Sequence, residues 1–230
     1  MSALHEIQQA VRGLSPGERT RLLDWMAVSL DVGLFITEPP VAYGAVALER
    51  DSYSVEEYLE LEENNSLACE YVAGQIYAMA EPSQTHEIIT TNMRAALHAH
   101  LRGQPCRAHA AERRILFTCR GDDVAYRPDV WVGCGEQRNA KGVLVGEPRL
   151  VIEVLSPSTA RIDRREKALN YRELPSLEEC LLVAQKNAHV TIYRRAQQWK
   201  RVILDSPDDV LELRSVGLVL PIAQIYEGIP

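Results

Sequence analysis

The spacing of hydrophobic and polar positions divides the chain into helix-like and strand-like stretches. Apolar residues recur at helical spacing in two short stretches, 2–14 and 15–30, and Ser15 and Glu18 form a capping box at the start of the second. The residues that follow contain two prolines and no sustained period, which is typical of a linker. The pattern therefore predicts a separate N-terminal part, residues 1–50, made of an αα-hairpin and a linker.

Residues 51–230 alternate between helical and strand-like patterns and are predicted to form the main domain. Helices are expected at 54–63, 83–103 and 160–173, with a capping box of Ser54 and Glu57 at the start of the first and Ser83 as the N-cap of the second. Strands are expected at 68–80, as a hairpin, and at 113–118, 125–133, 149–155, 179–184, 189–195, 199–205 and 210–215.

The order of these elements predicts an α/β fold (α+β mixed), with a central mixed sheet flanked by helices. The run 149–155 is almost wholly aliphatic, which is typical of a central strand covered on both faces. One residue breaks that run. The carboxylate of Glu153 is costly to bury unless another group pairs with it, so Glu153 has either a structural partner or a site to face.

Composition narrows the class of protein. The chain has 230 residues, of which 46% are hydrophobic and 25% charged, as in an ordinary globular protein. Its formal net charge of −7 argues against a sequence-independent nucleic-acid coat, which is usually basic overall. No apolar run is long enough to span a membrane and the N-terminus has no signal pattern, so we expect a cytoplasmic protein.

The cysteines are five in number and widely spaced, with no C-x-x-C pair. This spacing supports neither a disulfide framework nor a zinc site. We therefore expect reduced thiols in the core or on the surface at Cys69, Cys106, Cys119, Cys134 and Cys180.

Asp129 and Glu153 are the first candidates for a functional site. Asp129 follows Pro128 at the start of one predicted strand, and Glu153 lies in the middle of the next. If the two strands are neighbours, a divalent cation can hold together two carboxylates that otherwise repel each other, and Mg²⁺ prefers such oxygen ligands. Two alternatives remain: Asp129 as a turn residue, and Glu153 in a buried structural ion pair with Arg161 or Lys167.

The predicted helix after this strand adds further polar side chains. Lys167 and Tyr171 share one helical face, so Lys167 is placed to reach back, assist an attacking water and stabilise a phosphate. The alternatives are a solvated lysine and a tyrosine that only packs. The side chains on this helix that suit phosphate binding, or else a solvated charged face, are Arg161, Arg164 and Arg165.

These residues also carry a family resemblance. The motif "RPD", the segment "VIEVLSPST", and the lysine and tyrosine that follow resemble the Uma2-like endonucleases, a branch of the restriction-endonuclease-like PD-(D/E)XK superfamily. The resemblance covers residues 51–228 and implies that Asp129 and Glu153 correspond to the acidic pair of the superfamily. The superfamily lysine normally lies two residues after the glutamate, where this chain has Leu155, and the resemblance implies that Lys167 takes its place.

The resemblance implies further site residues and marks two departures. Glu70 and His86 match supporting positions of the family, and Tyr171 is expected to support the site as well. The chain departs at Ala73, where relatives commonly have an acidic residue, and at 184–185, where an aspartate is common. Both departures lie outside the acidic pair, so the expected chemistry is unaffected.

The resemblance implies a Mg²⁺-dependent (or Mn²⁺-dependent) endonuclease that hydrolyses DNA phosphodiester bonds. Asp129, Glu153 and Lys167 would be its catalytic set, with the two carboxylates as metal ligands. Because cleavage of both strands takes two active sites, we expect a homodimer. The alternative is a catalytically silent nuclease-fold module that acts in binding or protein–protein interaction, which the acidic net charge and the N-terminal hairpin favour.

Overall fold

The computed structural model describes residues 7, 10–15, 17–19, 21–22, 52–64, 68–79, 81–111, 113–134, 138–140, 143–145, 147–155 and 167–229. It forms two compact units, Met1–Ala80 with Phe117–Ala125, and Glu81–Leu116 with Tyr126–Pro230, and each is described by itself. The expected division into residues 1–50 and 51–230 stays a prediction. Among the described residues, every helix is too short or too polar to cross a membrane.

Two capping boxes in the first unit begin helices, as the sequence predicts. The Ser15 amide donates to Glu18 Oε2 over 2.8 Å, and the Glu18 amide donates to Ser15 Oγ over 3.3 Å. At the start of α3 (Val55–Asn64), the corresponding bonds between Ser54 and Glu57 are 2.8 and 3.2 Å long. Such bonds satisfy amides that a helix start leaves without partners. The remainder of the predicted N-terminal hairpin lies largely outside the described residues.

A β-hairpin about Ala73 and Gly74 is confirmed in the first unit. It belongs to a sheet of order β2-β1-β5-β4, made of β1 (Cys69–Val72), β2 (Gln75–Ala78), β4 (Ile115–Cys119) and β5 (Asp122–Tyr126). Gly74 has a φ of +92°, and a Cβ added there would lie 2.4 Å from Ser52 Oγ. Both the backbone conformation and the lack of space therefore require glycine at this turn.

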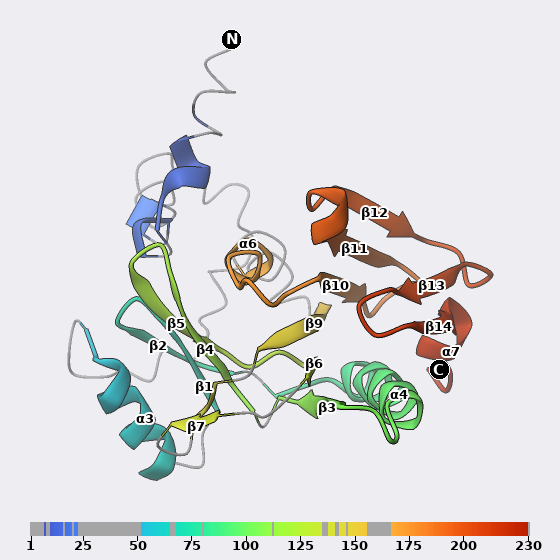
Figure 1. Cartoon of the computed structure of the whole chain (residues 1–230), viewed down its shortest axis with the longest axis horizontal. Coiled ribbons are helices and arrows are strands. Elements are labelled where there is room, and N and C mark those ends of the chain that lie inside the picture. The colour runs from blue at the N-terminus through green and yellow to red at the C-terminus, as the bar shows by residue number, and fades with distance from the viewer. Residues whose placement is uncertain are drawn as a thin grey trace. The chain divides into compact units, whose positions relative to one another are not determined.

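The second unit contains a six-stranded sheet of order β12-β11-β10-β9-β6-β3 (Figure 1). Its strands are β3 (Cys106–Ala110), β6 (Val130–Cys134), β9 (Pro148–Leu155), β10 (Glu179–Ala184), β11 (Val190–Arg194) and β12 (Arg201–Leu204). β9 pairs parallel with β10 and antiparallel with β6. The predicted central mixed sheet is confirmed, and the aliphatic run of β9 lies inside it.

The other elements of the second unit are short, apart from one helix. They are α4 (Gln84–His100), α6 (Ala168–Tyr171), α7 (Ile222–Ile225), the 3₁₀ helix η3 (Arg195–Gln197), and the paired strands β7 (Arg138–Ala140) with β8 (Val143–Val145) and β13 (Val210–Leu213) with β14 (Leu218–Pro221). Of the predicted helix 160–173, only the part from residue 167 onward is described.

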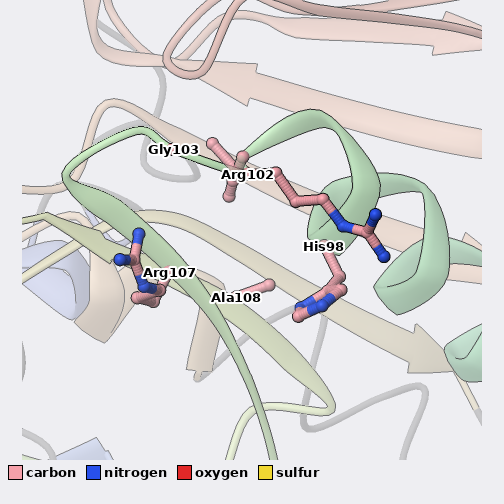
Figure 2. Close-up of a pocket in the computed structure, with 6 residues that line it drawn as sticks. His98, Arg102, Gly103, Arg107 and Ala108 are labelled. Carbon is pink, nitrogen blue, oxygen red and sulfur yellow. The ribbon is translucent and has the colours of Figure 1, made fainter.

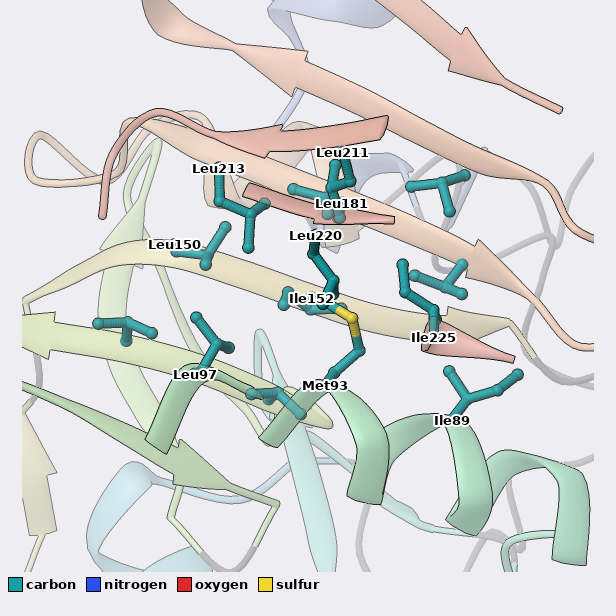
Figure 3. Packing of buried hydrophobic residues seen from close by; sticks show 14 of the residues in the cluster. Ile89, Met93, Leu97, Leu150, Ile152, Leu181, Leu211, Leu213, Leu220 and Ile225 are labelled. Atoms are coloured by element: carbon teal, nitrogen blue, oxygen red, sulfur yellow. The ribbon is translucent and has the colours of Figure 1, made fainter. Parts of the chain in front are cut away.

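One face of the six-stranded sheet forms the main core with α4. Ile152 of β9 lies beside Leu181 of β10, and both are fully buried with Met93 of α4. Figure 3 shows the Met93 side chain reaching Ile152. The helix fits this face because its apolar residues recur every three or four positions.

The opposite face of the sheet carries the polar positions. Glu153, Leu182 and Thr191 lie side by side on β9, β10 and β11, one residue along from the core row. Because successive residues of a strand project to opposite faces, this row points away from the α4 core. Figure 1 shows α4 and α6 on opposite sides of β9, so α6 covers the face that bears Glu153.

Several strands differ from the sequence predictions, and the short strands β7, β8 and β14 were not expected. The stretch 125–133 contains two strands rather than one, because β5 ends at Tyr126 and β6 begins at Val130. Pro128 lies in the break, where its missing N–H removes a donor that a continuous ladder would need. The strand β3 was not expected, because its alanine-rich sequence has little intrinsic strand preference and is held by pairing with β6.

The expectation of five reduced cysteines is wrong for two of them. Cys106 and Cys134 lie opposite each other on β3 and β6 and form a disulfide. Because β3 was not predicted, the sequence offered no reason to place these two residues together. The other three, Cys69, Cys119 and Cys180, are buried thiols outside any disulfide, as expected.

Candidate active site

The register between β6 and β9 brings Asp129 and Glu153 across from each other. Val130 pairs with Ile152, so the next position outward sets Asp129 opposite Glu153. Both residues are largely buried, with exposed fractions of 8% and 3%. Because β6 and β9 are neighbours in the sheet, the two carboxylates lie next to each other at the N-terminal end of β6, as a shared site requires.

Asp129 is held through both of its carboxylate oxygens. Oδ2 accepts a 2.7 Å hydrogen bond from the Val154 backbone amide, and Oδ1 lies 3.1 Å from His86 Nε2. A carboxylate only accepts hydrogen bonds, so the His86 Nε2 carries the hydrogen of this contact. The aspartate is therefore fixed to β9 on one side and to α4 on the other, which is more than a turn residue needs.

The first turn of α4 positions His86. The His86 amide donates to the Ser83 hydroxyl over 3.1 Å, which confirms Ser83 as the N-cap of α4. The same hydroxyl lies 2.6 Å from Gln185 Oε1, just beyond β10. Thr90, one turn later, donates to the His86 carbonyl over 2.8 Å. These local bonds anchor the start of α4 near the end of β10 and direct the imidazole toward Asp129.

Glu153 contacts two side chains from the segment around α6. The Tyr171 hydroxyl donates to Glu153 Oε1 over 2.8 Å, and Lys167 Nζ lies 3.8 Å from the same oxygen. Tyr171 is fully buried and Lys167 is 4% exposed. At 3.8 Å the ammonium is beyond hydrogen-bond distance, so the tyrosine rather than the lysine fixes the orientation of this oxygen.

A layer behind these residues was not found from the sequence. Asn170 Nδ2 donates to the Tyr126 hydroxyl over 2.7 Å, and Asn170 is fully buried. The Tyr126 ring meets the Tyr171 ring edge to face at 5.3 Å, and Lys167 Nζ lies 5.6 Å from its centre. The sequence signal was weak: Tyr126 precedes the "RPD" motif by one residue, and an asparagine inside a predicted helix suggests a specific partner.

The structure thus gathers five of the predicted site residues in the second unit, namely His86, Asp129, Glu153, Lys167 and Tyr171. Glu70 belongs to β1 in the first unit, where it is buried, with an exposed fraction of 2%. Its supporting role stays a prediction. The phosphate-binding candidates Arg161, Arg164 and Arg165 lie outside the described residues.

The donor set of this site suits a hard divalent cation. In the described part of the chain, no group of three or more His, Cys, Asp and Glu side chains is arranged to hold a metal. Mg²⁺ is commonly bound through only one or two carboxylates, with waters and phosphate oxygens as its other ligands. Asp129 and Glu153 provide such a pair, and the absence of cysteine ligands among these contacts does not favour zinc.

The mixed sheet of this chain has a counterpart among solved structures. A putative nuclease belonging to DUF820 from Anabaena variabilis superposes with a TM-score of 0.64, at 22% identity over 76% of this chain and 97% of that one. This likeness shows the fold, which is restriction-endonuclease-like.

Sequence comparison identifies the family. The Uma2 family model, described as "Putative restriction endonuclease", matches residues 55–223, so the chain belongs to the Uma2 family. Two uncharacterised proteins of Synechocystis are relatives. One, slr1290, is 34% identical over 76% of this chain and 92% of its own length; the other, sll1609, is 31% identical over 62% and 82%.

Proposed function

We propose that this protein is a divalent-metal-dependent endonuclease that hydrolyses DNA phosphodiester bonds. The observation that carries the proposal is the pairing of Asp129 and Glu153 across β6 and β9, with Lys167 beside them. Membership of the Uma2 family supports a nuclease, and we assign Mg²⁺ or Mn²⁺ as the metal from the oxygen donors of the pair.

The two carboxylates are the proposed metal ligands. When bound, the ion supplies a Lewis acid for the phosphate and for the attacking water. The protein contributes orientation: the Val154 amide and His86 hold Asp129, and the Tyr171 hydroxyl holds Glu153. Carboxylates fixed in this way lose little conformational freedom when they take up a ligand.

Lys167 is the proposed catalytic cation. Its ammonium lies 3.8 Å from Glu153 Oε1 and 5.6 Å from the Tyr126 ring centre, and Lys167 is only 4% exposed. In hydrolysis a water oxygen forms a bond to phosphorus, the bond to the bridging oxygen breaks, and charge grows on the phosphate oxygens. A buried ammonium stabilises that charge more strongly than a solvated one.

Other predicted residues complete the proposal. We assign Arg161, Arg164 and Arg165 to substrate phosphates because guanidinium groups bind phosphate oxygens in pairs. Glu70 is assigned a supporting role, on the family resemblance alone. The further layer of Asn170 and Tyr126 positions Tyr171 and Lys167 rather than contacting substrate.

A plasmid-nicking assay with Mg²⁺ or Mn²⁺ tests this function. The wild-type protein should nick supercoiled DNA, and Asp129→Asn and Glu153→Gln should each lose activity by more than about 10³, because each removes a proposed metal ligand. Asp208→Asn, which changes an exposed carboxylate in the same unit, is the matched control and should retain activity. Nicking that survives both site variants contradicts the proposal.

Calorimetry provides a second readout that does not depend on activity. Mg²⁺ or Mn²⁺ should bind the wild-type protein, and Asp129→Ala should abolish that binding. A folded wild-type protein that binds no divalent metal and nicks no DNA would instead support the silent nuclease-fold module.

We also propose a homodimer, since two sites are needed to cut both strands of a duplex. The apolar run "VGLFI" and the N-terminal helices are the proposed contact elements, and they lie largely outside the described residues. Light scattering at micromolar concentration should give twice the mass of one chain. A monomer mass contradicts the homodimer without affecting the assignment of the site.

A further inference from the structure

A row of side chains runs along α4 from the candidate site. His86, Thr90, Arg94, His98 and Arg102 follow one another at steps of four residues, up to the turn after the helix. Residues at this spacing form a continuous ridge on a helix surface, with a rise of about 6 Å per step. The ridge begins at the imidazole that contacts the site aspartate and becomes cationic and exposed further along.

Basic residues continue from α4 onto β3, which packs beside it. We call this the α4–β3 basic surface, and its exposed members are Arg94, His98, Arg102, Arg107 and Arg113. Residues 88–111 contain no aspartate or glutamate, although the whole chain has a net charge of −7. The surface is therefore a local positive region on an acidic protein, and such regions attract polyanions.

The α4–β3 basic surface is hollowed at its centre (Figure 2). The hollow has a volume of about 210 Å³ and is lined by His98, Leu101, Arg102, Gly103, Arg107 and Ala108, none of them acidic. Arg107 Nη1 donates to the backbone carbonyls of Gln104 and Cys106, which holds this guanidinium at the rim. Figure 2 shows His98 and Arg102 at the end of α4 and Arg107 on the following strand.

The two arginines at the ends of this surface also act on a half-buried histidine ring. His109 of β3 packs on Trp131 with ring centres 4.2 Å apart. Burial lowers the pKa of His109, and the charges of Arg113 and Arg94 lower it further, to about 4. Arginines at both ends of the surface thus act on one group between them, as expected where no acidic residue intervenes.

We propose that the α4–β3 basic surface binds the phosphodiester backbone of duplex DNA and guides it to the Asp129–Glu153 site. This inference rests on the proposed function and assigns its substrate-binding surface. The charges extend beyond the hollow, because Arg94 lies about two turns before Arg102 on the ridge and does not line it, and an extended row of charges suits a polyanion better than a small anion. Along one strand of a DNA duplex, successive phosphates are spaced about 3.4 Å along the helix axis. Arg94 and Arg102, about 12 Å apart along the helix axis, can therefore meet different phosphates.

Salt-dependent binding of a fluorescent duplex, measured by anisotropy in EDTA, tests the surface without requiring metal or cleavage. The variant Arg94→Gln/Arg102→Gln/Arg107→Gln should bind at least roughly tenfold more weakly, and its slope of log K against log salt should fall by about 2–3, because each lost phosphate contact contributes about 0.9. The charge-preserving variant Arg94→Lys/Arg102→Lys/Arg107→Lys should stay within about threefold of wild type, because phosphate contacts of this kind depend mainly on charge.

The matched control is Lys186→Gln/Lys200→Gln/Arg201→Gln, which removes three exposed charges elsewhere in the same unit. Its affinity and salt slope should remain near those of wild type. The inference is overturned if the arginine variant binds like wild type, if the control loses as much affinity, or if wild type does not bind duplex DNA. Melting curves on each protein confirm that a loss of binding is not a loss of folding, and the double variant Arg94→Gln/Arg102→Gln replaces the triple one if Arg107 proves necessary for folding.

The outcomes for this surface and for the proposed function are distinct. DNA binding that depends on the arginines, without nicking in Mg²⁺ or Mn²⁺, contradicts the endonuclease and leaves the surface standing. Metal-dependent nicking by wild type, together with unchanged DNA binding by the arginine variant, overturns the surface and leaves the endonuclease standing.

Discussion

Glu153 and Glu179 are two buried carboxylates on neighbouring strands with very different surroundings. Glu179 accepts from Arg194 Nε over 2.7 Å and from the amide and hydroxyl of Ser215 over 2.8 and 2.6 Å. Glu153 has the Tyr171 hydroxyl at 2.8 Å, while its cation Lys167 stays 3.8 Å away. Their exposed fractions, 2% and 3%, are almost equal.

The difference teaches that burial alone does not reveal the role of a carboxylate. Glu179 has its charge neutralised by a guanidinium in direct contact, and that guanidinium also donates to the Glu212 carbonyl over 2.8 Å, so the group is a closed structural unit. Glu153 faces a second carboxylate, Asp129, and its ammonium is not in hydrogen-bond contact. A carboxylate pair of this kind is the arrangement that a cation would stabilise.

The largest expected effect separates the two glutamates by stability. Glu179→Gln should lower the free energy of unfolding by about 3–5 kcal/mol, because it leaves the Arg194 charge buried without its partner. Glu153→Gln should leave the unfolding free energy in metal-free buffer within about 1 kcal/mol of wild type, because the loss of its 3.8 Å contact with Lys167 is offset by the loss of repulsion with Asp129. Urea denaturation measures both. Equal losses would show that Glu153 is a structural group like Glu179.

The second effect concerns the cation beside Glu153. Lys167→Ala should reduce nicking by about 10²–10³ and leave metal binding intact, because it removes a transition-state contact. If Lys167 instead serves as the structural counterion, its loss should destabilise the fold by about 3–5 kcal/mol. Lys186→Ala, at an exposed position, is the control. A large fall in melting temperature with residual nicking unchanged would exclude the catalytic assignment.

The third effect is stabilisation by metal. At a Mg²⁺ or Mn²⁺ concentration of about 100 times the dissociation constant, wild type should gain about 2.7 kcal/mol, since only the folded state presents both carboxylates. EDTA should reverse the gain. Glu153→Gln should show no such increase in melting temperature, whereas Glu178→Gln, an exposed neighbour of Glu179 that pairs with Arg149, should show the full increase. A gain that persists in Glu153→Gln places the metal elsewhere.

The smallest expected effect concerns His109, a titratable group near two arginines rather than near a counterion. The folded-state pKa of His109 is about 4, below its ordinary value of 6.5, through burial and then through Arg113 and Arg94. Between about pH 6.5 and pH 4, His109 is protonated in the unfolded chain and neutral in the folded chain. His109 therefore lowers the free energy of unfolding as the pH falls through this range. We expect His109→Gln to reduce the loss of unfolding free energy between pH 7 and pH 5 by about 1 kcal/mol. Urea curves at both pH values test this, and identical losses would contradict it.

The part of the site that sequence could predict rests on strong local patterns. Asp129 and Glu153 flank or interrupt well-defined strands, and the predicted adjacency of those strands follows from their order. The capping boxes at Ser15 and Ser54 are local in sequence, so they too could be predicted. Whether the carboxylates bind metal stays a prediction.

The remainder depends on contacts between distant residues. Glu179 is bonded to Ser215, 36 positions away, so the sequence gives no sign of the direct contacts that hold this glutamate. The bond between Asn170 and Tyr126 spans 44 positions. The disulfide of Cys106 and Cys134 depends on β3, a strand that forms only because β6 is beside it. Tertiary context sets these features, and local propensity carries little information about them.

The two outermost strands of the six-stranded sheet bear on how the protein resists aggregation. β3 and β12 are only five and four residues long, and each carries an exposed arginine, Arg107 and Arg201. Short, charged border strands oppose edge-to-edge joining, because adding another strand would bury a charge. Arg107 and Arg201 therefore hinder association through these two edges. We expect copies of this chain to associate, where they do, through surfaces other than these borders, and concentrated solutions not to seed fibrils from them.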